Sequence, residues 1–100
     1  MRAARVDRNQ IEIVRALRTA GCTVLILSTV GNGCPDILIG VPGATAEDRR
    51  NLLCEIKDGS KPPSARELTM EQIDFHIHWR GQVAVVTSVA EALALAGVTV

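Results

Sequence analysis

The sequence contains very few aromatic residues: one phenylalanine, one tryptophan and no tyrosine in 100 residues. Single-strand-binding modules of the OB and RRM kinds hold bases on aromatic side chains, so this scarcity argues against both classes. Nearly half of the residues are apolar, and the length is that of one ordinary domain. We therefore expect one compact core built mainly of aliphatic side chains.

An excess of charge is also absent, because eleven basic residues balance eleven acidic ones. A dedicated non-specific DNA-binding protein is usually basic, so any nucleic-acid binding must depend on a local patch or a metal site. One patch is visible within residues 1–20, where only Asp7 and Glu12 are acidic. It contains five arginines: Arg2, Arg5, Arg8, Arg15 and Arg18. A solvated helix face explains these arginines equally well.

The three cysteines, Cys22, Cys34 and Cys54, are odd in number, and no two have the short spacing of a zinc site. We expect buried free thiols, which suit a reducing compartment. No apolar run approaches the ~18 residues of a membrane span, and the N-terminus lacks the apolar stretch of a signal peptide. These features favour a cytoplasmic protein without a membrane partner.

Three helices are predicted, each beginning at a capping-box pair and ending at a glycine. The capping pairs and glycines are Asp7, Gln10 and Gly21 for the first, Thr69, Gln72 and Gly81 for the second, and Ser88, Glu91 and Gly97 for the third. Apolar spacing places one face of the first helix at Ile13, Val14, Leu17 and Ala20. A hydrophobic staple is expected between Val6 and Ile11. On the second helix, the same spacing aligns Ile73, Ile77 and Arg80.

Four strands are predicted at residues 23–28, 36–41, 51–57 and 82–87, with polar or glycine-rich loops at 30–34, 44–50 and 58–64. The order is helix, three strands, helix, strand, helix. Three consecutive strands favour an antiparallel meander, and the strand–helix–strand step favours a right-handed crossover to a parallel pair. We expect a mixed α/β fold with a central mixed sheet flanked by helices.

Charged residues occur where two apolar strands begin or end. Asp36 begins the second strand after Pro35, and Glu55 and Lys57 lie near the end of the third. Residues two apart in a strand share a face, and pairing of neighbouring strands would bring Asp36 close to Glu55. Two carboxylates beside a lysine suit a Mg²⁺ site, at which the metal polarises a phosphate and Lys57 stabilises developing charge. The alternative is a strand-end Glu–Lys pair and an unrelated aspartate in a turn.

The Pro35-Asp36 pair followed by Glu55-Ile56-Lys57 resembles the PD-(D/E)XK pattern of the restriction-endonuclease-like nuclease superfamily, whose core has the order αβββαβ. More narrowly, residues 33–40, 55–57 and 68–72 resemble the VRR-NUC branch, which includes small stand-alone domains in phages and bacteria. The resemblance implies a single nuclease domain over residues 1–100. It further implies a Mg²⁺-dependent DNA endonuclease in the cytoplasm of a bacterial or phage-infected cell.

The resemblance also implies a ligand set. In the family, the Asp and the Glu bind Mg²⁺ or Mn²⁺ together with the backbone carbonyl of the residue that precedes the lysine. Carried over, the ligands are Asp36, Glu55 and Ile56, and Lys57 is the catalytic lysine. An acidic residue of the first helix often joins them, and Glu12, which borders the apolar stripe, is the candidate. An exposed helical glutamate is the alternative for Glu12.

Gln72 matches a glutamine that relatives carry near the start of the second helix, close to the metal. Its other role is to close the capping box with Thr69, and both roles can hold at once. His76 and His78 are two residues apart on a helix and face different directions, so they do not form a metal pair. DNA contacts are assigned to Arg8, Asn32, Lys61 and Arg66, with ordinary loop polarity as the alternative.

Because electrostatic attraction supplies most non-specific DNA affinity, a neutral monomer would bind weakly. A symmetric homodimer would double the basic patch and present two active sites, which suits a four-way DNA junction. Stand-alone relatives of this size suggest that role. Two alternatives are a non-catalytic nucleic-acid-binding or scaffolding module of nuclease fold, and a nuclease subunit that acts only within a larger replication or repair complex.

Overall fold

The computed structural model describes residues 8–99, which follow the predicted order of elements. The helices are α1 (Arg8–Thr19), α2 (Met70–His78) and α3 (Val89–Ala96), and the strands are β1 (Thr23–Ile26), β2 (Ile37–Val41), β3 (Arg50–Ile56) and β4 (Val83–Val86). Short 3₁₀ turns cover Ala46–Asp48 and Pro63–Ala65. The predicted helix cap Asp7, the staple residue Val6 and the arginines Arg2 and Arg5 lie outside the described residues.

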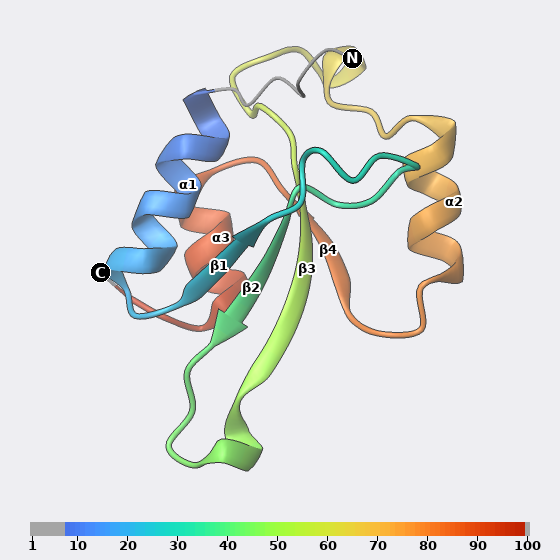
Figure 1. Cartoon of the computed structure of the whole chain (residues 1–100). Helices are drawn as coiled ribbons and strands as arrows, with labels where there is room; N and C mark the ends of the chain where they lie inside the picture. Colours follow the sequence, from blue (N-terminus) through green and yellow to red (C-terminus); the bar gives the residue numbers. More distant parts are fainter. Residues whose placement is uncertain (1–7, 100) are drawn as a thin grey trace.

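The four strands form one mixed sheet in the order β1-β2-β3-β4 (Figure 1). The β1–β2 and β2–β3 pairs are antiparallel, and the β3–β4 pair is parallel. Parallel neighbours need a long crossover, which the segment containing α2 provides. The predicted mixed α/β fold with a meander and one parallel pair is therefore confirmed.

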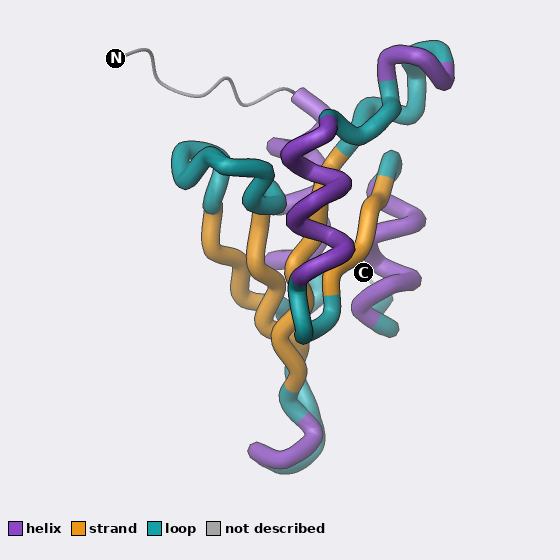
Figure 2. Tube along the Cα trace, turned by 90° about the vertical axis from the view of Figure 1, so that its right-hand side faces the viewer, coloured by secondary structure: helices purple, strands orange, loops and turns teal. Residues whose placement is uncertain are grey.

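Helices cover both faces of the sheet. α1 and α3 pack on one face, where Ile13 and Leu17 of α1 and Ala92 of α3 join the buried residues of β2 and β3 in one core. Figure 2, in which the right-hand side of Figure 1 faces the viewer, shows α2 in front of the other face. The β2–β3 hairpin projects away from the end at which the β1–β2 and β3–α2 loops gather (Figure 1). In the part of the chain that the structure describes, no helix has the length and hydropathy needed to cross a bilayer.

The predicted helix ends at glycine are confirmed for α1 and α3. Gly21 has φ +99°, and the N–H of Cys22 donates to the carbonyl of Leu17, which satisfies the end of α1. Gly97 has φ +71° and ends α3 in the left-handed conformation. At the start of α3, the Ser88 hydroxyl accepts from the N–H of Glu91, as a cap should.

The predicted end of the second helix was wrong. α2 stops at His78, because Trp79 has an extended backbone (φ −68°, ψ 126°), so Arg80 lies outside the helix. The predicted row of Ile73 and Ile77 is also not the face of α2 that packs on the sheet, because Ile73 is 39% exposed and Ile77 is 71% exposed. Half-buried residues of α2 are Gln72, Phe75 and His76.

The strand boundaries differ from the predictions by one or two residues. β1 ends at Ile26 and not at Ser28, since a turn follows in which the N–H of Val30 donates to the carbonyl of Leu27. β2 begins one residue later than predicted, at Ile37. β3 begins and ends one residue earlier than predicted, at Arg50 and Ile56, and β4 is one residue shorter at each end.

The β1–β2 loop meets the start of α2 through Gly33. This glycine has φ +77°, and a Cβ there would lie 3.0 Å from the nitrogen of Gln72 and closer still to the carbonyl of Glu71. Gly31, in the same loop, has a similar φ of +80° but open space around the position of a Cβ. Only glycine therefore permits the close approach at residue 33.

We expect Gly33→Ala to destabilise the fold by at least about 1 kcal/mol more than Gly31→Ala. Both substitutions incur the left-handed backbone cost of about 1–2 kcal/mol, but only the first pushes a methyl group into the α2 backbone. Urea unfolding of the two variants and the parent measures the difference. Equal losses would show that the loop does not depend on contact with α2.

Candidate active site

Asp36 and Glu55 stand opposite each other at the end of the β2–β3 ladder. The register pairs Ile37 with Cys54, so the next residues outward are Asp36 and Glu55. Directly opposed residues of an antiparallel pair point to the same face and approach closely. The Asp36 carboxyl lies near enough to that of Glu55 to help raise the pKa of Glu55. The predicted approach of these two residues is confirmed.

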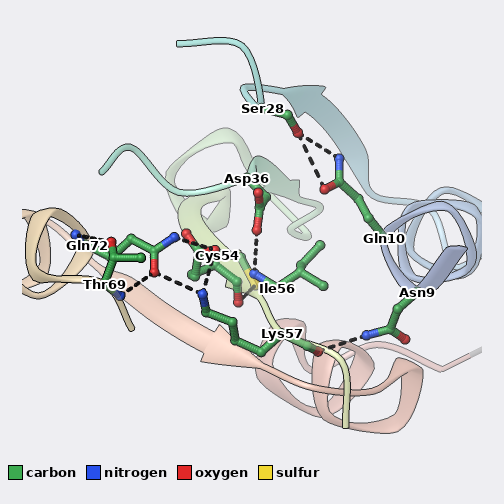
Figure 3. A network of polar contacts seen from close by, with 10 residues as sticks. Asn9, Gln10, Ser28, Asp36, Cys54, Ile56, Lys57, Thr69 and Gln72 are labelled. Carbon is green, nitrogen blue, oxygen red and sulfur yellow. Dashed lines mark hydrogen bonds and ion pairs between the residues drawn. The ribbon is translucent and has the colours of Figure 1, made fainter. Parts of the chain in front are cut away.

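The Asp36 carboxylate is held by the backbone of β3. Its Oδ2 accepts a hydrogen bond of 2.7 Å from the N–H of Ile56 (Figure 3). The backbone carbonyl of Asp36 accepts from the N–H of Leu27, and the preceding Pro35 is fully buried. Both contacts fix the direction of the side chain where β2 begins.

Glu55 is a buried acid, with 3% of the residue exposed. Its Oε2 accepts a hydrogen bond of 3.3 Å from Nε2 of Gln72 and lies 4.0 Å from Nζ of Lys57. Its Oε1 is buried and has no hydrogen-bond donor among the described residues. An ionised carboxylate so placed is costly unless a cation or a proton compensates it.

Burial raises the pKa of Glu55 to about 8, and Asp36 acts in the same direction. Lys57 opposes the rise. In the absence of a cation, Glu55 therefore retains its proton to higher pH than an exposed glutamate does. The arrangement therefore favours any positive charge that can replace this proton.

Gln72 links the start of α2 to both charged residues of β3. Its Nε2 donates to Glu55, and its Oε1 accepts from Nζ of Lys57 at 2.9 Å and from the N–H of Thr69 at 2.9 Å. The Thr69 hydroxyl accepts in turn from the N–H of Gln72. Figure 3 shows Gln72 reaching from the helix toward Lys57. The predicted capping box is confirmed, and the same side chain contacts the site.

The first helix contributes two amides that the sequence analysis did not assign to the site. Asn9 donates from Nδ2 to the carbonyl of Lys57 at 2.8 Å (Figure 3). It also donates to the carbonyl of Thr87 at 3.3 Å, which ties α1 to the ends of β3 and β4. Gln10 is 4% exposed and donates to the hydroxyl of Ser28 at 3.0 Å. Asn9 belongs to no motif and Gln10 was predicted only as a capping residue, so only three-dimensional placement identifies these contacts.

A cavity of about 420 Å³ opens between the β1–β2 loop and α2. Ser28, Cys34 and Asp36 line one side, and Glu71 and Gln72 line the other. The cavity thus gives access to the Asp36 end of the carboxylate pair from the side on which the loop meets the helix.

Glu12 does not join the carboxylates. It forms an ion pair of 3.4 Å with Arg8, and the two side chains are 51% and 92% exposed. The physical reason is helix phase: Gln10 faces the interior, and two residues along an α-helix rotate the direction by about 200°. The structure therefore places Glu12 on the outer side of α1, beside the cavity that Asp58 and Ser60 also line.

The predicted DNA contacts Asn32, Lys61 and Arg66 lie in two different loops. Asn32 has φ 57° and is exposed in the β1–β2 loop, though it does not line the cavity that contains Asp36. Lys61 is exposed in the β3–α2 loop, where it lies near Asp58. Arg66 is half-buried, and its charge adds to the hydrogen bonds from Thr87 that lower the pKa of Glu91.

One histidine, His78, lies at the surface and two of the three cysteines are buried, whereas His76 and Cys34 have other environments. His78 is ion-paired with Asp74 at the surface, whereas His76 is half-buried with an unpartnered Nε2, and burial followed by the charge of Lys57 lowers its pKa. Cys22 and Cys54 are buried free thiols, as predicted, but Cys34 is only half-buried and lines the cavity of Asp36.

The oxygen atoms of the site meet some of the coordination requirements of a hard divalent cation. Among residues 8–99, no three His, Cys, Asp or Glu side chains gather closely enough to hold a metal ion. The pair Asp36 and Glu55, the buried unsatisfied Oε1 and the nearby backbone carbonyl of Ile56 nevertheless offer oxygen ligands only. Mg²⁺ commonly uses one or two carboxylates and completes its shell with waters and phosphate oxygens.

Comparisons with protein-family models, with curated proteins and with solved structures find no match to this chain.

We expect the folded protein to lose stability as the pH rises from about 4.5 toward 8 when divalent cations are absent. The pKa of Glu55 is raised from 4.5 to about 8 on folding, so within this window the folded state retains a proton that the unfolded state has released. The loss should approach about 1.4 kcal/mol for each pH unit. Urea unfolding in EDTA at several pH values measures it.

Glu55→Gln is the matched control, because the amide keeps the shape of the side chain without its titration. As the pH rises through this window, the parent should lose stability relative to the variant. A constant difference would contradict the assignment of the raised pKa to Glu55.

Proposed function

We propose that this protein is a divalent-metal-dependent endonuclease that hydrolyses DNA phosphodiester bonds, with a restriction-endonuclease-like αβββαβ core. One observation carries the proposal: Asp36 and Glu55 face each other at a strand end, with Nζ of Lys57 4.0 Å from Glu55. The resemblance of residues 35–36 and 55–57 to the PD-(D/E)XK pattern supports it, since the same residues form the cluster.

Asp36, Glu55 and the carbonyl of Ile56 would hold Mg²⁺, or Mn²⁺ in its place. When bound, the ion would polarise the scissile phosphate and lower the pKa of a water ligand. Glu55 would give up its proton for the cation, which would also satisfy the buried Oε1 of Glu55. Both changes remove an electrostatic cost that the metal-free pair carries.

Lys57 would act on the charge that develops at the phosphorus centre or orient the attacking water. Its side chain is 15% exposed and is hydrogen-bonded to Gln72, so it is held in one place before the substrate arrives. A preorganised cation in a partly dehydrated site stabilises such charge more strongly than a mobile one in water. Gln72 would position Lys57 and Glu55 together.

The substrate that we propose is branched or otherwise structured DNA, such as a four-way junction, cut by a homodimer. The support is the zero net charge, which gives one copy little general affinity for a duplex. Two copies would present two sites to a substrate that has two strands to cut. Lys61 and Asn32, both exposed in loops at the end of the sheet where the site lies, are the DNA contacts that best fit this arrangement.

We expect purified protein to cut a synthetic four-way junction with Mg²⁺ or Mn²⁺, and Asp36→Asn, Glu55→Gln and Lys57→Ala each to slow cutting by about 10²-fold or more. Each variant removes one of the charges that the site brings together. A panel of single strands, duplexes, flaps and junctions, with each metal and with EDTA, measures the rates.

Glu47→Gln is the control for a lost carboxylate, because Glu47 is exposed in the β2–β3 hairpin, at the far end of the molecule (Figure 1). Cutting that persists in both Asp36→Asn and Lys57→Ala would refute the assignment of the site. Neither metal binding nor cutting of any DNA form would favour a non-catalytic module. Cutting that appears only with added replication or repair proteins would favour a subunit of a larger complex.

A second prediction separates the two roles of Gln72. Thr69→Ala and Gln72→Ala both break the capping box and should each cost about 1 kcal/mol of stability. Only Gln72→Ala also removes the hydrogen bonds to Glu55 and Lys57, so only it should slow cutting by tenfold or more. Similar cutting rates in the two variants would mean that Gln72 is a helix cap and no more.

A further inference from the structure

β1 forms one edge of the sheet, and hydrogen bonding to β2 sets which of its backbone groups face outward. The N–H of Leu27 donates to the carbonyl of Asp36 across the β1–β2 pair. Backbone groups in an antiparallel ladder alternate in direction, so those of Thr23 and Leu25 also point to β2. Those of Val24 and Ile26 therefore point away from β2, to the open edge.

This edge is only partly protected. Nη2 of Arg18 donates to the carbonyl of Val24 at 3.1 Å, which covers one outward group. β1 has no charged residue and no proline, the two devices that commonly protect an edge strand. Leu25 and Ile26 are 61% and 47% exposed. Within residues 8–99 no group pairs with the N–H and carbonyl of Ile26, which are thus available to another strand.

A cavity of about 600 Å³ lies beside this edge, between α1 and β1. Ile11, Val14 and Ile26 contribute apolar surface, and Arg15 and Arg18 contribute positive charge. None of its lining residues in the described chain is acidic, and Glu12, the neighbouring carboxylate of α1, is paired with Arg8 instead. The apolar side chains and the arginines adjoin the outward backbone of Ile26. We call this cavity the edge groove.

We propose that the edge groove and β1 bind an extended segment of a partner protein that adds a strand to the sheet. The segment would hydrogen-bond to the backbone of Ile26 and place one apolar side chain in the edge groove. A carboxylate two residues away, on the same face of the added strand, would reach Arg15 or Arg18. The partner chemistry is therefore a β-strand with the pattern acidic–any–apolar or its reverse.

Charge complementarity selects this occupant over a second copy of the chain. Antiparallel pairing of β1 with its own copy has a two-fold axis perpendicular to the sheet, which keeps both α1 helices on one face. It would bring Arg15 and Arg18 of each copy toward those of the other. DNA would supply negative charge but nothing to cover Ile11 and Ile26, so an acidic strand fits both features and DNA fits one.

The test uses the full chain and a capped peptide, acetyl-Thr-Glu-Thr-Ile-Thr-Glu-Thr-amide, which offers the pattern in either direction. In an NMR titration we expect the largest shifts at the amides of Val24 and Ile26, and slower exchange of the Ile26 N–H. Replacing both glutamates with lysine, or the isoleucine with serine, should weaken binding by tenfold or more. Arg15→Glu should weaken the acidic peptide and strengthen the lysine peptide.

Ile26→Lys should abolish binding, and Val30→Lys is its control, because Val30 is 57% exposed but outside the edge groove. Three outcomes would overturn the proposal. One is an absence of β1 shifts at millimolar peptide, and another is equal binding of the acidic and lysine peptides. The third is that a DNA duplex, or a second copy of the protein, shifts the same amides and binds with higher affinity than the peptide. None of these outcomes depends on nuclease activity.

Discussion

The placement of two carboxyls opposite each other on adjacent strands is the interaction on which the site depends. Asp36 and Glu55 are neighbours because the β2–β3 register puts them in direct opposition, one step beyond Ile37 and Cys54. Such a pair is unfavourable without a proton or a cation, and the nearby donors reduce but do not remove the cost. The donors are the backbone N–H of Ile56 and the side chains of Gln72 and Lys57, which β3 and α2 hold in place.

The position of α2 follows from the same requirement. Its first turn must lie over the face of β3 that carries Glu55, and two contacts hold it there: the side chain of Gln72 on the strand and the backbone of Glu71 against Gly33. The apolar residues Ile73 and Ile77 do not provide this docking, because they are exposed. Polar contacts and a tight backbone approach therefore position the first turn of α2 and also complete the site, while the half-buried Phe75 and His76 lie further along the helix.

Strand alternation and helix capping are local rules, and what depends on them was predictable from the sequence. The shared face of Glu55 and Lys57, the approach of Asp36 and the capping role of Gln72 all belong to this group. Features that depend on the rotation of a helix about its axis were not predictable. Glu12 and Gln10 are two residues apart at the edge of an apolar stripe, and only packing against the sheet decided that Gln10 faces inward. Asn9 acts on two strand ends distant in sequence, so no local pattern could identify it.

The distribution of the arginines constrains how a phosphate could be attracted to the site. Arg8 is paired with Glu12, Arg66 lies beside Glu91, and Arg15 and Arg18 line the edge groove, which shares no lining residue with the cavity of Asp36. The described arginines of the basic patch, Arg8, Arg15 and Arg18, are thus divided between two surfaces. At the carboxylate pair itself Lys57 is the cation that the described residues supply, so a polyanion would meet net negative charge there once both acids ionise. In the proposed nuclease, a bound divalent cation would neutralise carboxylates that repel DNA, and a bound phosphate would attract the cation, so the two binding steps would be coupled.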